Sequence, residues 1–266
     1  MDMDTFWNDF QLVRTGNPLV LNVTNHVVTN NTANALLAAG ASPIMTFSSR
    51  EVEDLMKISG ALVINIGTLN TQDIGLMHAA WSSANAMRVP VVFDPVGAGA
   101  STLRTSSSQE LLSLYRPDII RGNASEIMTL AGEAGQAKGV DSSLGADAAV
   151  AAARALAQMH SCTTVVSGEV DIVTDGNHVY RVNGGHALMP RVTGLGCTAT
   201  AICGAFLAVN RNRNEAAVDA MALMAIAGGM AGAMAQGPGS LQMHFYDMLY
   251  SLKKSDAERL FSVTRD

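Results

Sequence analysis

The chain has 266 residues, of which 48% are hydrophobic and 5% aromatic, and its formal net charge is −6. This length suits one large domain or two small ones. Because no linker-like stretch divides the sequence, we expect a single domain over residues 1–266. The longest basic run is Lys253-Lys254, which argues against nucleic-acid binding, since backbone phosphates require a basic face.

Cysteine usage and the N-terminus indicate a reducing, cytoplasmic location. The three cysteines, Cys162, Cys197 and Cys203, are odd in number and have no disulfide-framework spacing. The N-terminal segment is acidic and lacks the apolar core of a signal peptide. Residues 192–210 and 220–236 are long enough to span a membrane. Both are rich in small residues and lack basic flanks concentrated on one side, so we interpret them as buried helices.

Short apolar runs alternate with helical patterns along the first two thirds of the chain. We expect strands at residues 20–23, 43–45, 62–66, 89–93, 118–121 and 163–167. We expect helices at 32–37, 52–58 and 72–87. Short β-branched runs separated by helices indicate parallel strands covered on both faces. The predicted fold class is therefore α/β, with a mostly parallel sheet between two helical layers.

The last third of the chain departs from this alternation. Residues 171–174 and 179–182 flank an Asp-Gly-Asn turn and predict a hairpin that adds antiparallel strands at one edge of the sheet. After Gly194 the pattern is helical to the end. The candidate helices cover residues 197–209, 215–236 and 241–254. The longest flexible-looking stretch, 97–108, directly follows a predicted strand.

Polar residues and glycines follow the predicted strands at their carboxyl ends, where open parallel sheets carry their ligand sites. These positions are Asn25, Met45, Gly67, Asp94, Arg121, Ser167 and the Gly194–Cys197 turn. Each of them alone is compatible with an ordinary loop. Their convergence on one edge of the sheet predicts a binding site there.

The turn Gly194-Leu195-Gly196-Cys197 precedes a small-residue helix. Glycines allow a tight turn and a close backbone approach to a ligand. The N–H groups and dipole of a helix N-terminus form an anion site, and a thiol at that position is expected to ionise more easily. Cys197 is thus a candidate base beside a candidate phosphate site. The simpler alternative is a loop that packs a helix against the sheet.

Two acidic residues are candidate metal ligands. Asp94 precedes Pro95 and either starts a turn or holds a hydrated Mg²⁺ ion. Asn123 and Glu126 have the spacing of a capping box, so Glu126 either caps a helix or serves the metal and phosphates. Arg121 either forms a structural salt bridge or contacts a phosphate.

Several other chemistries lack their motifs. The sequence has no P-loop, no nucleophile elbow and no dinucleotide-binding glycine pattern at its first strand-to-helix turn. Its histidines, such as His26 and His186, have no zinc-binding spacing.

The assembled motifs resemble the hydroxyethylthiazole kinase family of the ribokinase-like superfamily, over nearly the whole chain. The resemblance rests on Thr24-Asn25, Ala41-Ser42-Pro43-Ile44-Met45, Asn65-Ile66-Gly67-Thr68-Leu69, Asp94-Pro95-Val96-Gly97-Ala98-Gly99, Arg121-Gly122-Asn123-Ala124-Ser125-Glu126-Ile127, Ser167-Gly168-Glu169 and Gly194-Leu195-Gly196-Cys197. The arginine motif and the Gly-x-Gly-Cys turn are together highly specific. Related kinases of the superfamily typically carry Asp where this family has Cys.

The resemblance implies a three-layer ribokinase-like fold and transfer of phosphate from MgATP to the hydroxyl of 4-methyl-5-(2-hydroxyethyl)thiazole, a step of thiamine salvage. It implies a homotrimer with substrate sites at the subunit interfaces. The implied substrate-binding residues are Asn25, Met45, Gly67 and Gly194. The implied nucleotide-binding residues are Arg121, Ser167 and Gly196, with Asp94 and Glu126 serving Mg²⁺ and Cys197 accepting the hydroxyl proton.

Two residues depart from the family pattern. Leu195 stands in the glycine turn where Thr is usual, so a hydroxyl that could contact a phosphate is lost. Ser167 replaces a commoner Thr and keeps the hydroxyl.

Three rival functions stay open at this point. The first is a kinase of the same fold that acts on a pyrimidine alcohol or a sugar. The second is an ATP- or ADP-dependent dehydratase, for which Asp is expected in place of Cys197. The third is a nucleotide-binding redox sensor with Cys197 as its reactive thiol, for which Cys203 is poorly placed as a partner.

Overall fold

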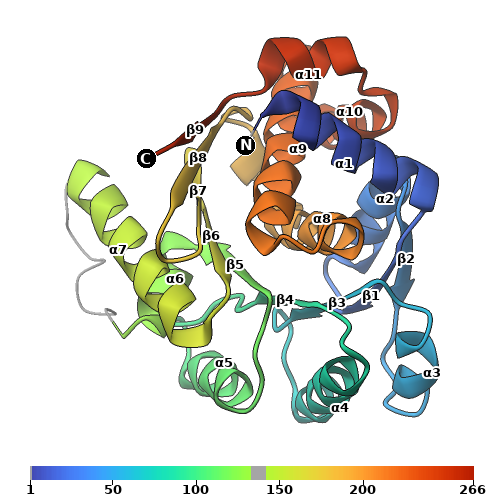
Figure 1. Ribbon diagram of the computed structural model, residues 1–266, viewed down its shortest axis with the longest axis vertical. Coiled ribbons are helices and arrows are strands. Elements are labelled where there is room, and N and C mark those ends of the chain that lie inside the picture. Colours follow the sequence, from blue (N-terminus) through green and yellow to red (C-terminus); the bar gives the residue numbers. More distant parts are fainter. Residues whose placement is uncertain (1, 133–141) are drawn as a thin grey trace.

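The computed structural model describes residues 2–132 and 142–266, which form a nine-stranded sheet with helices on both faces (Figure 1). The strand order is β2-β1-β3-β4-β5-β6-β7-β8-β9. The strands are β1 Leu19–Val23, β2 Ser42–Met45, β3 Ala61–Asn65, β4 Val91–Asp94, β5 Ile119–Asn123, β6 Thr163–Ser167, β7 Val170–Thr174, β8 Val179–Asn183 and β9 Val263–Arg265. The first six pair in parallel, and β7, β8 and β9 pair antiparallel.

Two helical layers enclose this sheet. One contains α1 Met3–Gly16, α2 Thr29–Ala39, α8 Leu195–Val209, α9 Arg213–Met234, α10 Pro238–Ser251 and α11 Lys254–Leu260. The other contains α3 Val52–Met56, α4 Thr71–Met87, α5 Thr102–Leu114, α6 Ala124–Leu130 and α7 Ser142–His160. Within β3, Val63 packs in the first core, while Leu62 and Ile64 pack in the second. Because successive side chains point to opposite faces, these buried apolar strands supply both cores, and the predicted α/β architecture is confirmed.

The expected strands and the hairpin are present, with shifted ends. The fourth strand begins at Val91 rather than at residue 89, and Pro90, which cannot donate a ladder hydrogen bond, stays outside it. The expectation of a flexible stretch at 97–108 is wrong, because α5 begins at Thr102. Ser101 caps that helix by accepting a hydrogen bond from the backbone N–H of Arg104 at 3.3 Å.

The C-terminal third is not helical throughout. The expected helices correspond to α8, α9 and α10, but the chain continues through α11 into β9, which extends the sheet beyond β8. Two further helices, α1 and α7, lie where the sequence patterns predicted no element.

Both membrane-like stretches lie in the core, as expected. Among the described residues, α9 alone is long and apolar enough to cross a membrane, and 78% of its most apolar window is buried. The shorter apolar helix, α8, is buried along most of its length.

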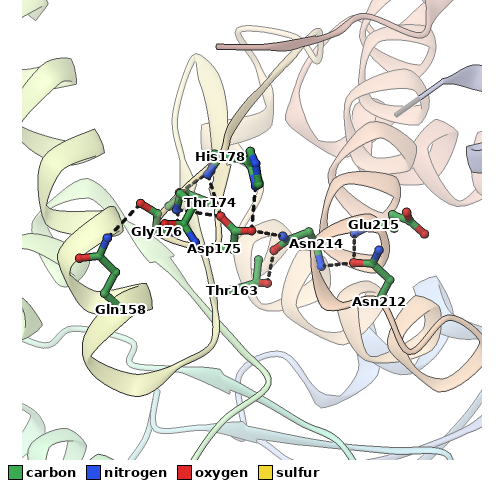
Figure 2. A network of polar contacts seen from close by, with 10 residues as sticks. Gln158, Thr163, Thr174, Asp175, Gly176, His178, Asn212, Asn214 and Glu215 are labelled. Atoms are coloured by element: carbon green, nitrogen blue, oxygen red, sulfur yellow. Dashed lines mark hydrogen bonds and ion pairs between the residues drawn. The ribbon is translucent and has the colours of Figure 1, made fainter.

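A polar network fastens the β7–β8 hairpin to the start of α9 (Figure 2). The side chain of Asn214 donates to Asp175 in the hairpin turn at 2.8 Å and accepts from Thr163 of β6. Asn212 caps α9 through the backbone N–H groups of Asn214 and Glu215. These contacts fix the antiparallel edge of the sheet relative to the helical layer.

A second polar group lies between α1 and α9. Asp219 is fully buried, and neither of its carboxyl oxygens has a hydrogen-bond donor among the described residues. Burial raises the pKa of Asp219 to about 9, and contact with Asp9 and the charge of Glu215 add to the shift. Asn210 donates to both Asp9 and Glu215, at 2.6 and 3.1 Å. Asp219 is therefore protonated at neutral pH.

We expect the Asp219→Asn substitution to reduce the pH dependence of stability. The pKa of Asp219 rises from 3.8 to about 9 on folding, so the folded chain holds one more proton between these values. The stability that Asp219 contributes is therefore complete at low pH. As pH rises, the free energy of unfolding falls by at most about 1.4 kcal/mol per pH unit. We expect thermal melts to show that the stability of the Asp219→Asn variant relative to wild type is higher at pH 8.5 than at pH 6. Asp247→Asn, at an exposed site, is the control. Equal shifts at both pH values would contradict the assignment.

Candidate functional site

A buried chain of hydrogen bonds links three neighbouring strand ends. Asn25 follows β1, Asn65 ends β3 and Asp94 ends β4. The side-chain amide of Asn25 donates to Asn65 at 2.8 Å, and that of Asn65 donates to Asp94 Oδ2 at 2.7 Å. Thr200 of α8 donates to the same oxygen at 2.7 Å. The parallel register places these groups together at the carboxyl ends of the strands, as the sequence predicted for Asn25 and Asp94.

Asp94 is fully buried and has one unused oxygen. Oδ1 has no hydrogen-bond donor among the described residues. Burial raises the pKa of Asp94 to about 6, against the opposing effects of the Arg121 charge and the Thr200 and Asn65 hydrogen bonds. The carboxylate is therefore mostly ionised at neutral pH. A buried, charged oxygen without a donor is costly, which marks Oδ1 as a position for a bound group.

The glycine turn leads into α8 beside this chain. Gly194 has a φ of +85°, and a Cβ there would lie 2.8 Å from Val28 Cγ1. A Cβ at Gly196 would lie 2.8 Å from a guanidinium nitrogen of Arg121. No side chain among the described residues caps the start of α8, so its first-turn N–H groups point to an open end. This is the geometry of an anion site.

Cys197 is half-buried at this helix end, with Sγ 3.6 Å from the side-chain nitrogen of Asn25. The expected ease of ionisation is wrong. Burial raises the pKa of the Cys197 thiol to about 11, and the negative charge of Asp94 adds to the effect. Partial burial and the neighbouring carboxylate both disfavour the charged form of the thiol. Cys197 is a neutral thiol at pH 7.

Arg121 and Ser167 lie together on the adjacent strands β5 and β6. Nε and a terminal nitrogen of Arg121 donate to Ser167 Oγ at 3.0 and 2.6 Å. Both residues line a cavity of about 1060 Å³, together with Gly194 and Gly196. The sequence placed Arg121 at the end of its strand, but it lies in the middle of β5.

The same cavity contains a carboxylate that the sequence analysis missed. Asp171 of β7 accepts a hydrogen bond from the N–H of Gly168 at 3.0 Å, and burial raises its pKa to about 6. Met189, Met221 and Met224 supply an apolar wall. The sequence assigned Asp171 only to a hairpin strand, and its position in the cavity depends on how β7 pairs with β6.

Glu126 forms the capping box with Asn123 that the sequence allowed. Its Oε2 accepts from the N–H of Asn123, and Asn123 accepts from the N–H of Glu126, at 2.8 and 2.9 Å. Its Oε1 accepts from the N–H of Gly97 at 2.8 Å. Glu126 therefore holds the loop after Asp94 against α6. A metal role for this residue stays a prediction.

Arg104 is a second residue that sequence reasoning missed. One terminal nitrogen donates to the carbonyl of Val96 at 2.7 Å, and the other donates to the carbonyl of Gly67. It thus joins the loops that follow β3 and β4. No sequence signal identified it, because it lies in the stretch that was expected to be flexible.

The predicted substrate residues divide into two sets. Gly67 lies against Asn25, where a Cβ would come 2.5 Å from the amide nitrogen, and its N–H donates to Asn65 at 2.9 Å. Met45 ends the edge strand β2, half-exposed, and does not line the 1060 Å³ cavity. The single chain therefore brings together Asn25, Gly67 and Cys197, while Met45 lies on the outermost strand, β2.

The fit of Mg²⁺ depends on Asp94. The described residues contain no group of three or more Asp, Glu, His or Cys side chains that could hold a metal. Mg²⁺ commonly uses one or two carboxylates and completes its shell with water and substrate phosphates. The unused Oδ1 of Asp94 fits this requirement, whereas both oxygens of Glu126 already accept backbone N–H groups.

We expect Glu126→Gln to destabilise the fold, because the glutamine amide retains one acceptor where the carboxylate uses two. One partly buried backbone N–H would lose its partner, at a cost of about 1 kcal/mol. Urea denaturation measures this loss. Glu110→Gln, at an exposed position on α5, should stay within about 0.5 kcal/mol of wild type. Unchanged stability of the Glu126 variant would show that these hydrogen bonds contribute little.

Comparison with known proteins places this geometry in a family. Residues 10–255 match the model of the hydroxyethylthiazole kinase family. A hydroxyethylthiazole kinase of Nitratidesulfovibrio vulgaris is 53% identical over 97% of both chains. The solved hydroxyethylthiazole kinase of Pyrococcus horikoshii is 38% identical, with a TM-score of 0.92 over 99% of both chains. A Staphylococcus aureus pyridoxal kinase, at 17% identity and a TM-score of 0.66 over 94% of this chain and 98% of that one, shares the fold. The chain has the ribokinase-like fold and belongs to the hydroxyethylthiazole kinase family.

Proposed function

We propose that this protein transfers the γ-phosphate of ATP to the hydroxyl of 4-methyl-5-(2-hydroxyethyl)thiazole, giving the thiazole phosphate for thiamine salvage. Family membership supports this reaction. The observation that carries it is the arrangement at the start of α8, where uncapped N–H groups lie beside both Arg121 and the Asn25–Cys197 contact. An anion site thus adjoins a place for a hydroxyl group.

The thiazole is proposed to bind near Asn25, Met45, Gly67 and Gly194. A side chain at Gly67 would collide with the amide of Asn25, so glycine lets the loop after β3 pack closely against it. Asn25 is itself fixed by Asn65 and by the N–H of Val27, so its side chain is positioned before substrate arrives. Such preorganisation lowers the entropy cost of binding.

ATP is proposed to bind along Arg121, Ser167 and Gly196. Arg121 is 8% exposed, its guanidinium is held by Ser167 at the cavity, and no carboxylate of the described residues forms an ion pair with it. A guanidinium and helix N–H groups stabilise charge on a transferring phosphoryl group.

Mg²⁺ is proposed at Asp94 and Glu126, where it would neutralise charge on the ATP phosphates when bound. Asp94 Oδ1 is the atom available to hold the ion or one of its waters. Glu126 orders the loop from Asp94 to Gly97 through its bond to the Gly97 N–H. Its contribution to the metal site is therefore proposed to be positional at least in part.

Cys197 is proposed to accept the proton of the substrate hydroxyl. Only a small fraction of this thiol is ionised at neutral pH, since its pKa is about 11. Positioning and electrostatics must therefore supply most of the rate. Phosphoryl transfer tolerates this, because its transition state places little demand on an early proton acceptor.

A cytoplasmic homotrimer is the proposed working form. The edge strand β2 is half-exposed along its length, and Val27, Leu37 and Phe47 are exposed apolar residues. Phe47 stacks on His26 beside Asn25. Because Met45 lies at the same edge, a neighbouring subunit that covers this edge would complete the substrate site.

The reaction is tested by an ADP-release assay with the thiazole alcohol. We expect Mg²⁺-dependent turnover, with kcat/KM for the thiazole alcohol at least 100-fold above that for pyridoxal, about 2.7 kcal/mol of transition-state discrimination. EDTA should abolish the activity, and excess Mg²⁺ should restore it. Equal rates on pyridoxal, a pyrimidine alcohol or a sugar would contradict the proposed specificity.

The role of Cys197 is tested by the pH dependence of kcat/KM, which reports groups of the free enzyme. With a pKa of about 11, the ionised fraction rises about tenfold per pH unit, so kcat/KM should rise with it between pH 7.5 and 9.5. Cys197→Asp should keep substantial activity with a flat profile. Cys197→Ala should lose about 10²–10⁴-fold with ATP affinity retained. Full turnover in the Ala variant would exclude the catalytic role.

The trimer is tested by sedimentation velocity and by substitution at the β2 edge. Phe47→Asp should dissociate the assembly and raise KM for the thiazole, because the charge would face the interface. Ile58→Asp, at another exposed apolar position, should leave both properties unchanged. A wild-type chain that sediments as an active monomer would contradict the proposal.

A further inference from the structure

A second pocket lies at the amino ends of the parallel strands, whereas the site described above lies at their carboxyl ends. It has a volume of about 680 Å³ and is lined by four arginines, Arg88, Arg116, Arg211 and Arg213, and by Asp118. Arg88 ends α4, Arg116 precedes β5, and the other two lie at the turn from α8 to α9. The amino ends of β4 and β5 form its base.

The charge of this pocket contrasts with the rest of the chain. The protein has 17 basic residues and a net charge of −6, and four of those basic residues converge here. Asp118 is already engaged, since Oδ2 accepts from the N–H of Val91 at 2.9 Å and Oδ1 pairs with Arg213 at 3.8 Å. Four guanidinium groups against one carboxylate leave an excess of three positive charges.

Three of the four arginines are available to a ligand. Arg88, Arg116 and Arg211 have exposed side chains and form no ion pair with another described residue. Arg88 also has a φ of 58° at the end of α4, a left-handed position that favours glycine or asparagine.

The walls of the pocket are partly apolar. Val89, Pro90, Leu114 and Leu207 line it beside the arginines. Guanidinium groups recognise phosphate through paired hydrogen bonds, and apolar walls accept a ring. We propose that this pocket is a second, non-catalytic site for a small phosphorylated heterocycle. The inference goes beyond the proposed function.

The two sites are separate but share structural elements. Helix α8 begins at the glycine turn and reaches this pocket at Leu207, about 18 Å away at 1.5 Å per residue. Strand β4 begins at this pocket and ends at Asp94. A ligand bound at the arginines therefore leaves the catalytic cavity free, and both sites can be occupied together.

Arginine footprinting locates the site directly. Phenylglyoxal modification of each arginine is followed by peptide mass spectrometry, with and without 4-methyl-5-(2-hydroxyethyl)thiazole phosphate. We expect at least fivefold slower modification of Arg88, Arg116 and Arg211, with Arg50 and Arg259 unchanged. Absence of protection at the first three would overturn the proposal.

Calorimetric titration with the same thiazole phosphate counts the sites. Wild type should bind two molecules per chain, and the triple variant Arg88→Ala, Arg116→Ala and Arg211→Ala should lose one or bind it at least tenfold more weakly. The charge-matched control Lys57→Ala, Lys254→Ala and Arg259→Ala, at exposed positions, should keep both.

Inorganic phosphate separates the two parts of the ligand, and we expect it to bind at least tenfold more weakly at the arginines. Equal affinity for inorganic phosphate would overturn the assignment of a heterocycle, and identical binding by both triple variants would overturn the site. None of these measurements uses turnover, and the footprinting and the comparison of the two triple variants report on the arginines alone, so they stay informative if the ADP-release assay fails.

Discussion

The position of Asp94 is the constraint on which the site depends. Its carboxylate ends β4 in the interior, where Asn65 and Thr200 both donate to one oxygen and the other oxygen is left without a donor among the described residues. This arrangement requires the parallel register of β3 and β4 and the approach of α8 from a distant part of the chain. A change at any of these partners would leave a buried charge without its hydrogen bonds, which is strongly destabilising.

Helix α8 connects the two halves of the proposed active site. Its uncapped N-terminus faces Arg121 on one side and Asn25 on the other, and Thr200, one turn further, reaches Asp94. Small residues make this possible, because a side chain at Gly196 would collide with the guanidinium. Leu195 is different, since it is only 9% exposed and packs in the apolar core.

The sequence predicted strands β1 to β8, the edge of the sheet that carries the site, and the capping box of Asn123 and Glu126, because these follow from local patterns, but it missed β9. It did not predict the ionisation of Cys197. A helix N-terminus is visible in sequence, whereas the burial that raises the pKa of this thiol and the nearby Asp94 carboxylate arise only from tertiary packing. Arg104 and Asp171 were missed for the same reason: their partners lie on loops and strands that only the folded chain brings close.

Two buried aspartates show why position matters more than burial alone. Asp94 and Asp219 are both fully buried, yet the pKa of Asp94 is about 6 and that of Asp219 about 9. Arg121 and two neutral donors oppose desolvation at Asp94, whereas Asp9 and Glu215 reinforce it at Asp219. Asp94 therefore stays mostly ionised at neutral pH and can attract a cation, while Asp219 holds a proton in the contact between α1 and α9. An aspartate thus serves the proposed chemistry at position 94 and helix packing at position 219, because the charges of the neighbouring residues differ.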